Sequence, residues 1–392
     1  MRENIHEAID DLYPEMVKIR RYLHQHPELS FAETETAKFI AGYYKELGIP
    51  YQTNIGANGV IATLKGGKSG KTVCLRADFD ALPIQEENDV PYKSTVDGVM
   101  HACGHDGHTA QLLALAKAVQ AFQEELPGTI IFLHQHAEEY APGGAKPMIE
   151  SGALDGIDAV FGTHLWATTP FGVLQTAKTA FMAGADRFEI TIQGKGGHGA
   201  YPHETKDSLV IGSQLITQLQ QIVARRIDPL KTAVITVGKF EGGSAFNVIA
   251  DKAKLLGTVR YFDPAIQDQI ITEMENSIKG ACIASGATYE FNYRKGYPPL
   301  INHPEEVELV LKVGNELPDV VSSDEVPPVM AGEDFAYYML ERPGAFFFTG
   351  AQKGDDPYPH HHPKFDINEG AMPIAAKTLI DVYLKYQEQH QA

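Results

Sequence analysis

Apolar residues recur every three or four positions in the first part of the chain, which is the rhythm of amphipathic helices. A helix is expected over residues 3–26, where His26 precedes a proline that would end it. A second helix is expected over 33–48, closed by Gly48. The apolar face of the first helix would be formed by Ile5, Ile9, Leu12, Met16, Ile19 and Leu23.

Short apolar runs after these helices predict strands, interrupted by a third expected helix over about 107–124. The runs at 129–134 and 158–163 are apolar throughout, as in strands that are covered on both faces. Because strands and helices alternate, we expect a parallel or mixed sheet with helices on both sides. The expected strands of this part are 51–55, 59–65, 72–78, 129–134 and 158–163.

The middle of the chain changes its pattern. Asp263 and Pro264 suit the start of a helix, as cap and first helical residue. The order of elements is βαββαβ, which is typical of a ferredoxin-like α+β domain. In sequence order we expect a strand at 187–194, a helix at 207–226, strands at 232–240 and 252–262, a helix at 264–285 and a strand at 287–294.

The last part returns to the first pattern, and 392 residues are more than one hydrophobic core usually holds. We therefore predict an α/β domain with a mixed sheet, made of 1–180 and 296–392, and a ferredoxin-like α+β domain inserted at 181–295. The elements expected after the insertion are helices at 303–315, 333–341 and 368–388 and a strand at 344–349.

Composition narrows the possible partners. The formal charge of −18 disfavours binding to nucleic acid or to an anionic membrane. No apolar run approaches the roughly 20 residues of a membrane span, and the first residues lack the apolar core of a signal peptide, so a cytoplasmic location is expected. Three cysteines, Cys74, Cys103 and Cys282, argue against a disulfide framework.

Metal-ligand residue types cluster where predicted strands end. The segment 101–108, which contains Cys103 and three histidines, precedes the expected helix at 107–124. Further candidates follow later strands, and the carboxyl ends of strands are where open α/β sheets place their sites. Imidazole, thiolate and carboxylate together suit borderline divalent metals. The candidates are Asp78, Asp80, Cys103, His105, Glu138, Glu139, His164 and one histidine of 360–362.

Two details qualify this set. His108 is expected to support a ligand or pack at the helix start instead of binding metal itself. Glu138 and Glu139 would be a solvated acidic loop if they stood alone. Beside the other candidates, one of them can bind metal while the other accepts a proton from water and passes it to a leaving amine.

Several motifs together resemble the metallo-amidohydrolase and aminoacylase family, which includes hippurate hydrolases, plant indole-acetyl-amino-acid hydrolases and related carboxypeptidases. The resemblance covers nearly the whole chain. With a cysteine at position 103 the chain resembles the amidohydrolase branch, since other branches carry aspartate there. The motifs are at 20–30, 75–83, 101–108, 137–139, 162–165, 196–200 and 331–335.

The resemblance implies a site for two divalent ions, manganese or zinc, with cobalt as a further alternative. Cys103 matches the ligand that bridges both ions. Glu138 matches the general base, and Asp80 matches an aspartate that orients a ligand. The remaining ligands implied are His105, Glu139, His164 and His361, the last in a register that the triple histidine leaves open.

The resemblance also makes the insertion a lid and dimerisation domain, so a homodimer is expected, with a tetramer as the alternative. His198 matches a histidine that reaches the neighbouring subunit's site and stabilises the tetrahedral intermediate. Asn247 and Arg260 match residues that hold the substrate's carboxylate or scissile carbonyl. Glu333 and Asp334 match residues near the site, or they cap the helix at 333–341.

These observations predict a dinuclear metal-dependent amidohydrolase that cleaves the amide bond of N-acyl amino acids. The alternative is a metallopeptidase acting on dipeptides or short peptides, which the same residues would serve. A binding protein without turnover and a redox role for Cys103 are weaker alternatives. Complete ligands and an intact Glu138 argue against the first, and the lack of a second cysteine nearby argues against the other.

Overall fold

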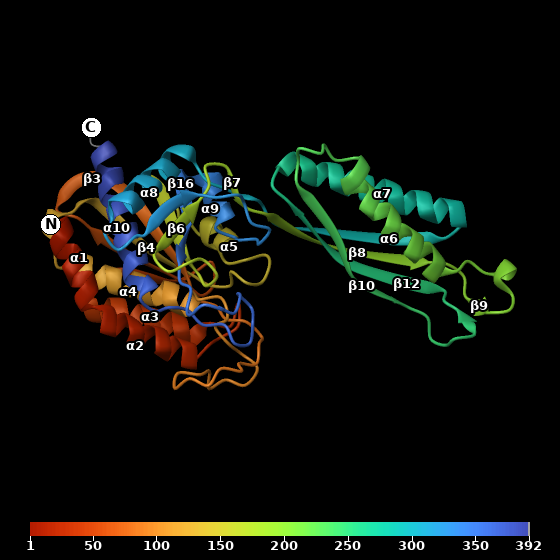
Figure 1. Cartoon of the computed structure of the whole chain (residues 1–392), viewed down its shortest axis with the longest axis horizontal. Helices are drawn as coiled ribbons and strands as arrows, with labels where there is room; N and C mark the ends of the chain where they lie inside the picture. The colour runs from red at the N-terminus through yellow and green to blue at the C-terminus, as the bar shows by residue number, and fades with distance from the viewer. Residues whose placement is uncertain (391–392) are drawn as a thin grey trace. The chain divides into compact units, whose positions relative to one another are not determined.

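The computed structural model describes residues 1–390, which form two compact units (Figure 1). Unit 1 contains residues 1–181, 301–327 and 334–390 of this range, and unit 2 contains residues 182–300 and 328–333. The sequence pattern assigned segment 328–333 to the α/β domain. It groups with unit 2 instead, because the backbone N–H of Ala183 bonds to the carbonyls of Val329 and Ala331 at 3.1 and 2.9 Å. Within residues 1–390, no helix has both the length and the apolar character of a membrane span.

Unit 1 is built on an eight-stranded sheet. The sheet is mixed, as predicted, and contains two strands, β6 and β15, that were not expected. Its central strands run parallel, whereas β1, β2 and the β16–β6 pair add antiparallel neighbours. The order across the sheet is β1 (Tyr51–Ile55), β2 (Gly59–Lys65), β4 (Pro127–Gln135), β3 (Lys68–Asp78), β5 (Ala159–Trp166), β16 (Gly344–Gly350), β6 (Val173–Thr176) and β15 (Ser322–Glu325).

The long helices of unit 1 pack against this sheet. The helix expected over 3–26 is wrong as a single element, because the chain breaks at Leu12 and restarts with Pro14 in the first turn of the next helix. Proline has no N–H and clashes with the preceding turn, so it suits a helix start and not a helix interior. The helices are α1 (Arg2–Asp11), α2 (Tyr13–Gln25), α3 (Thr34–Leu47), α4 (His105–Gln120), α5 (Ala145–Glu150), α8 (Pro304–Glu316), α9 (Ala336–Glu341) and α10 (Ala371–Gln389), with a 3₁₀ turn η1 (Gln123–Glu125).

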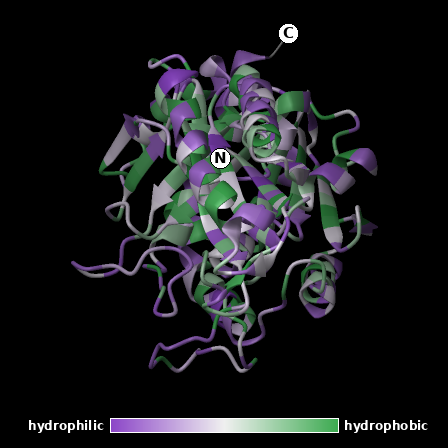
Figure 2. Ribbon diagram, turned by 90° about the vertical axis from the view of Figure 1, so that its right-hand side faces the viewer, coloured by the Kyte–Doolittle hydropathy of each residue, from purple (hydrophilic) through white to green (hydrophobic). Residues whose placement is uncertain are grey.

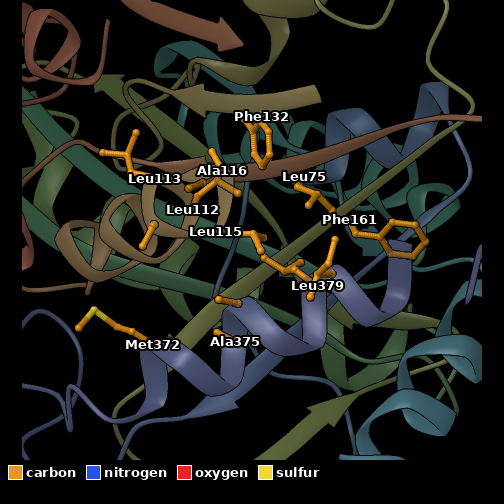
Figure 3. Close-up of a cluster of buried hydrophobic side chains, with 14 of the residues drawn as sticks. Leu75, Leu112, Leu113, Leu115, Ala116, Phe132, Phe161, Met372, Ala375 and Leu379 are labelled. Atoms are coloured by element: carbon orange, nitrogen blue, oxygen red, sulfur yellow. The ribbon is translucent and has the colours of Figure 1, made fainter. Parts of the chain in front are cut away.

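The main hydrophobic core lies between the sheet and helices α4 and α10 (Figure 3). Nearly every residue of α4 is buried, including the polar residues of its first two turns. Each large apolar side chain buried here contributes roughly 1.5–3 kcal/mol. In Figure 3 the sheet contributes Leu75, Phe132 and Phe161, and the helices contribute Leu112, Leu115, Ala375 and Leu379.

The outer helices bury only one stripe of residues. In α1, for example, only Ile5 and Ile9 are buried. In Figure 2, which is coloured by hydropathy, hydrophobic and hydrophilic residues alternate along the helices. These are the helices whose three-to-four residue periodicity was visible in the sequence.

Unit 2 has the predicted ferredoxin-like fold. Its four strands form an antiparallel sheet in the order β10, β12, β8, β13, and α6 and α7 lie on the same side of it (Figure 1). Asp207 and Asp263 cap the two helices by accepting backbone N–H groups, and Gly286 ends α7. The elements are β8 (Gly184–Gln193), α6 (Ser208–Arg225), β10 (Ala233–Gly242), β12 (Lys252–Tyr261), α7 (Pro264–Ser285) and β13 (Thr288–Tyr297).

Smaller elements complete the chain. Strands β9 (Gly197–His198) and β11 (Val248–Ile249) pair with one another in unit 2, near the turn η2 (Pro202–Glu204). Strands β7 (Ala180–Met182) and β14 (Leu300–Ile301) form a second two-stranded sheet. None of them has more than three residues, too few to show a periodic pattern in the sequence.

Candidate metal centre

The predicted ligands of unit 1 converge at the carboxyl ends of its parallel strands. Asp78 ends β3, Glu138 and Glu139 follow β4, and His164 lies near the end of β5. Cys103 and His105 flank Gly104, whose φ of +92° is a left-handed conformation that favours glycine. This turn at the start of α4 lets both side chains reach the same place.

Two groups of possible metal ligands share Cys103. One comprises Cys103, His105 and His164, and the other comprises Cys103, Glu139 and His361; in each group the donor atoms all lie within 4.8 Å of one another. Cys103 Sγ lies 3.4 Å from His164 Nε2, and His361 Nε2 lies 3.2 Å from Glu139 Oε1. The two three-residue groups therefore have one thiol in common.

His105 is held for this purpose by Asp80. Its Nδ1 lies 3.0 and 3.1 Å from the backbone and side-chain oxygens of Asp80, whereas its buried Nε2 has no hydrogen-bond partner among residues 1–390. An imidazole fixed by a carboxylate through one nitrogen, with the other nitrogen free, is the usual form of a metal-binding histidine. Asp80 also accepts the backbone N–H of Glu139 at 2.9 Å, which ties two ligands to one carboxylate.

The electrostatics of the site favour a cation. Burial alone would lower the pKa of His105, but Asp78 and Asp80 raise it to about 10. Burial and the carboxylates of Glu139, Glu138 and Asp78 raise the pKa of the Cys103 thiol well above its ordinary value. A reactive thiol needs a lowered pKa, so this setting argues against a redox role, whereas a divalent ion would supply the positive charge that a thiolate needs.

His108 supports the site and does not face it with a free nitrogen. Its Nδ1 lies 2.6 Å from Asp78 Oδ1, and its Nε2 accepts the backbone N–H of Leu165 at 2.9 Å. Both ring nitrogens are therefore in use. This agrees with the supporting role expected from the sequence.

The three consecutive histidines have three different environments. His361 has a φ of +65°, unusual for a residue with a side chain, and this turn brings its ring to Glu139. His360 accepts the backbone N–H of Ala167 at 3.1 Å through Nε2, and its Nδ1 lies 3.7 Å from Cys103 Sγ. His362 stacks on Tyr358, with ring centroids 4.5 Å apart. The geometry thus favours the register His361, which the sequence left open.

We expect His361→Ala to weaken metal binding more than the roughly 10- to 100-fold cost of changing an outer-shell residue. One of the two candidate groups would lose a donor while the other keeps all three. His362→Ala, which changes the half-buried neighbouring histidine, is the matched control and should bind metal like the wild type. Metal content after desalting and calorimetric titration would measure both, and loss of metal from the His362 variant alone would contradict the assignment.

Sequence reasoning missed a buried charge network behind the ligands. Arg76 in β3 lies 2.6 Å from Asp78 and 3.2 Å from Asp334, and Gln135 donates to Asp334 at 2.7 Å. Burial raises the pKa of Asp78, but Arg76 and the nearby histidines lower it well below its ordinary value. An arginine in an otherwise apolar strand is the signal that could have revealed this network.

The suggestion that Glu333 and Asp334 cap a helix is wrong. Helix α9 begins only at Ala336, and no side chain caps it. Asp334 instead accepts the backbone N–H of Ala145 at 3.0 Å, in addition to its contacts with Arg76 and Gln135. Its carboxylate therefore joins the start of α5 to the central strands.

Glu33 was also missed. Its carboxylate accepts the backbone N–H of Ala137 at 2.8 Å and the side-chain amide of Asn58 at 3.0 Å. Ala137 has a φ of +52° and directly precedes Glu138, so Glu33 holds a strained turn in the segment that carries the acidic pair. Burial raises the pKa of Glu33 to about 7. Its position before a helix gave no sign of this contact.

A second buried network joins the two ends of unit 1. Arg20 in α2 is fully buried and donates to Asp106 at 2.9 Å, to Asp366 at 2.8 Å and to Glu369 at 3.2 Å. Asp106 follows the candidate ligand His105 directly, and Asp366 is five residues after His361. One guanidinium thus fixes both ligand-bearing segments.

Arg20→Met should lower the free energy of unfolding by about 3 kcal/mol, the lower end of the cost of breaking a buried ion pair, because the buried Asp106 keeps only His24 as an ion-pair partner among residues 1–390. Arg21 donates to Glu369 only and is partly exposed, so Arg21→Met should change stability by less than about 1 kcal/mol. Urea unfolding of both variants measures the difference. Equal effects would mean that the buried position of Arg20 has no special importance.

Three predicted site residues belong to unit 2. His198 pairs with Val248 across β9 and β11, and the N–H of Gly199 donates to the carbonyl of Asn247 at 2.8 Å, so His198 and Asn247 are neighbours. Arg260 lies near the opposite end of the main sheet of this unit. It is eight residues along β12 from Lys252, or roughly 26 Å in a strand.

Comparison with known proteins places this site in a family. The model of peptidase family M20/M25/M40 matches residues 74–385. The chain belongs to this family. It is therefore a hydrolase that acts on amide or peptide bonds.

Relatives from this family carry both amidohydrolase and peptidase names. An N-acyl-L-amino acid amidohydrolase of Geobacillus stearothermophilus is 45% identical over 304 residues, covering 78% of this chain and 82% of that protein. Thermostable carboxypeptidase 2 of Saccharolobus solfataricus is 39% identical over 392 residues, covering 99% of both chains.

A solved structure of the same family is similar over nearly the whole chain. It is the YxeP protein of Bacillus subtilis, a dinuclear metal-binding peptidase of the M20 family. The identity is 33%, the TM-score is 0.84, and the match covers 97% of this chain and 99% of that one. Both the mixed α/β architecture and the presence of candidate metal ligands in this chain agree with that neighbour.

Proposed function

We propose that this M20 family member is a dinuclear metal-dependent amidohydrolase that cleaves N-acyl amino acids, with Glu138 as the general base. The observation that carries this proposal is the pair of ligand groups that share Cys103. Glu138 belongs to the same cluster, because its carboxylate lies within 4.8 Å of donor atoms of His105 and Glu139.

The residues divide the work as follows. Cys103, His105 and His164 would hold one divalent ion, and Cys103, Glu139 and His361 the other, with Asp80 fixing His105. When bound, the ions, manganese or zinc, supply Lewis acidity that polarises a carbonyl and lowers the pKa of water. Mixed sulfur, nitrogen and oxygen donors suit several borderline metals.

Glu138 moves the proton. Its carboxylate takes one proton from the attacking water as the new C–O bond forms, and delivers it to the amine nitrogen as the C–N bond breaks. The products are a carboxylic acid and a free amino acid. Glu139 cannot share this role while its carboxylate serves as a ligand, because lone pairs that bind an ion do not accept a proton.

His198 and Arg260 would act on the oxyanion and on the substrate's carboxylate. Because roughly 26 Å of strand separates Arg260 from the end of the sheet near His198, one copy of unit 2 cannot place both on one small substrate. This separation supports a homodimer in which His198 serves the neighbouring subunit, with a tetramer as a larger assembly of the same kind. Asn247, as a neighbour of His198, would serve the same site of the neighbouring subunit.

A peptidase acting on dipeptides is the second candidate, favoured by the names of the carboxypeptidase and YxeP relatives. One experiment tests both functions. Purified protein is assayed for metal and for hydrolysis of N-acetyl amino acids, hippurate and dipeptides, before and after chelation and with manganese or zinc restored. Two ions per chain and metal-dependent release of free amine from the acyl amino acids support the proposal.

Other outcomes of this experiment have clear meanings. Faster cleavage of dipeptides than of every acyl amino acid would replace the proposal by the peptidase function. Bound metal without turnover on any compound would indicate a binding protein. Turnover that survives chelation would overturn the metal-dependent mechanism.

A further inference from the structure

One face of the unit 2 sheet carries an unusual group of arginines. Phe188, Ile190 and Val259 point to α6 and α7 and form the core of this unit. Side chains alternate along a strand, so Arg187 and Arg260 point to the opposite face. In Figure 1 both helices lie on the core side of the sheet, and within unit 2 no helix covers the face of the arginines.

Three arginines meet on this face. Arg187 of β8 is directly opposite Arg294 of β13, and Arg260 of β12 is directly opposite Ala185, two residues before Arg187. Diagonal neighbours of this kind lie within reach of long side chains, and like charges directly opposite each other destabilise a sheet. The arrangement therefore concentrates positive charge on one face of the sheet.

The acidic groups nearby are already engaged. Glu189, on the same face, forms an ion pair with Lys254 at 2.7 Å, and Arg187 and Arg294 also attract its carboxylate without forming an ion pair with it. Glu241 pairs with Lys239 at 2.6 Å. Asp186 lies on the core side, where it accepts hydrogen bonds from Tyr293 and Gln267, both at 2.7 Å. Among residues 1–390, neither Arg187 nor Arg294 forms an ion pair with a carboxylate.

The same face has room for a ligand. A shallow hollow of about 400 Å³ lies beside Arg187, with Thr236, Lys239, Leu256 and Thr258 among its lining residues. Arg260 is half-buried and its guanidinium bonds to Thr258 and to the carbonyl of Val259, at 3.1 Å for the latter, and to no carboxylate of the described chain. The surface of the hollow is largely apolar, with Arg187 and Lys239 as its cations, which suits a short carbon chain that ends in an anionic group.

We infer that Arg187 and Arg294, beside Arg260, select substrates that carry a second carboxylate. The inference rests on the proposed function, in which Arg260 binds the carboxylate of an N-acyl amino acid. One carboxylate can satisfy one guanidinium in a bidentate pair, which leaves the two facing arginines for another. A protein with a net charge of −18 repels dianions elsewhere, so local cations are needed to bind one.

The second carboxylate has two possible sources, which two pairs of compounds distinguish. N-acetyl-L-glutamate against N-acetyl-L-glutamine tests the amino-acid side, and N-succinyl-L-alanine against its succinyl monoamide tests the acyl side. Within each pair, the size is nearly equal and only one charge changes. The metal-loaded enzyme should cleave the acidic member of one pair roughly tenfold or more faster, measured as kcat/KM.

The variant that tests the arginines is Arg187→Met combined with Arg294→Met. In this variant, the ratio of kcat/KM for the acidic member to kcat/KM for the neutral member should fall close to one. The kcat/KM for the neutral compounds should stay within about twofold of the wild-type value. Both side chains are exposed, and removing two facing charges should leave the melting temperature equal or higher. Arg226→Met, which removes a unit 2 arginine paired with Glu273, is the matched control and should keep the preference.

Two results would overturn the inference but leave the proposed function intact. One is equal cleavage of the acidic and neutral members of both pairs by the wild type, and the other is an unchanged preference in the double variant. If the metal-loaded enzyme cleaves none of the four compounds, the proposed function fails and the inference fails with it.

Discussion

Glu138→Gln should lower kcat by roughly 10²- to 10⁴-fold, the usual contribution of a general base, while both ions stay bound. Glutamine keeps the size and one oxygen of glutamate but cannot accept the proton of the attacking water. The five proposed ligands are unchanged, so metal content should match that of the wild type. Steady-state kinetics and metal analysis of the same preparation measure the two quantities.

Glu139→Gln is the matched control, because it makes the same chemical change one residue away. Glu139 is proposed to bind metal, so this variant should lose metal affinity as well as activity. If Glu138→Gln loses metal and Glu139→Gln keeps it, the two roles must be exchanged. If Glu138→Gln keeps wild-type kcat, the proposed proton transfer is wrong.

Much of the fold could be predicted because its signals are local. The helix α7 begins with a capping aspartate and a proline and ends with a glycine, and its predicted bounds, 264–285, are those observed. The apolar runs of β4 and β5 likewise predict buried parallel strands. In each case the residues that decide the element lie within it or next to it.

The errors have equally physical causes. Pro14 lies inside the apolar pattern of the first helix, and the pattern does not record that a proline must restart the helix there. The short strands β6 and β15 and the helix α5 have only four to six residues, too few for a period to appear. Their formation depends on neighbours such as β16 that are distant in sequence.

In the site too, some features follow from the local sequence and others depend on distant contacts. Residue types alone indicated metal ligands, but the contacts that hold them join distant segments. Arg20 meets Asp106 across 86 residues, and Arg76 meets Asp334 across 258 residues. The register of the triple histidine depends on the positive φ of His361, which no local pattern foretells.

Cys103→Ala should have the largest effect on metal binding, because Cys103 is the one residue common to both ligand groups. Each group would fall from three donors to two, so both ions should be lost during purification, and activity with them. The stabilisation that bound metal gives to the folded state should disappear as well, because a ligand stabilises only the state that binds it. Metal analysis, and melting temperatures with and without added manganese or zinc, would measure these changes.

Cys282→Ala is the control for removing a thiol, because Cys282 is a buried cysteine that belongs to none of the candidate ligand groups. It should keep both ions. If Cys103→Ala keeps two ions per chain, the two groups do not depend on a shared thiolate, and the dinuclear arrangement proposed for this chain is wrong.

Cys103→Asp separates the bridging role from the chemistry of sulfur. A carboxylate has two oxygens and can bridge two ions, and the resemblance drawn from the sequence places aspartate at this position in other branches of the family. The variant should therefore recover metal that the alanine variant loses. Because a thiolate is a softer ligand than a carboxylate, the preference should shift from zinc toward manganese. Recovery of both ions with this shift would show that position 103 must bridge, and that its sulfur tunes which metal is held.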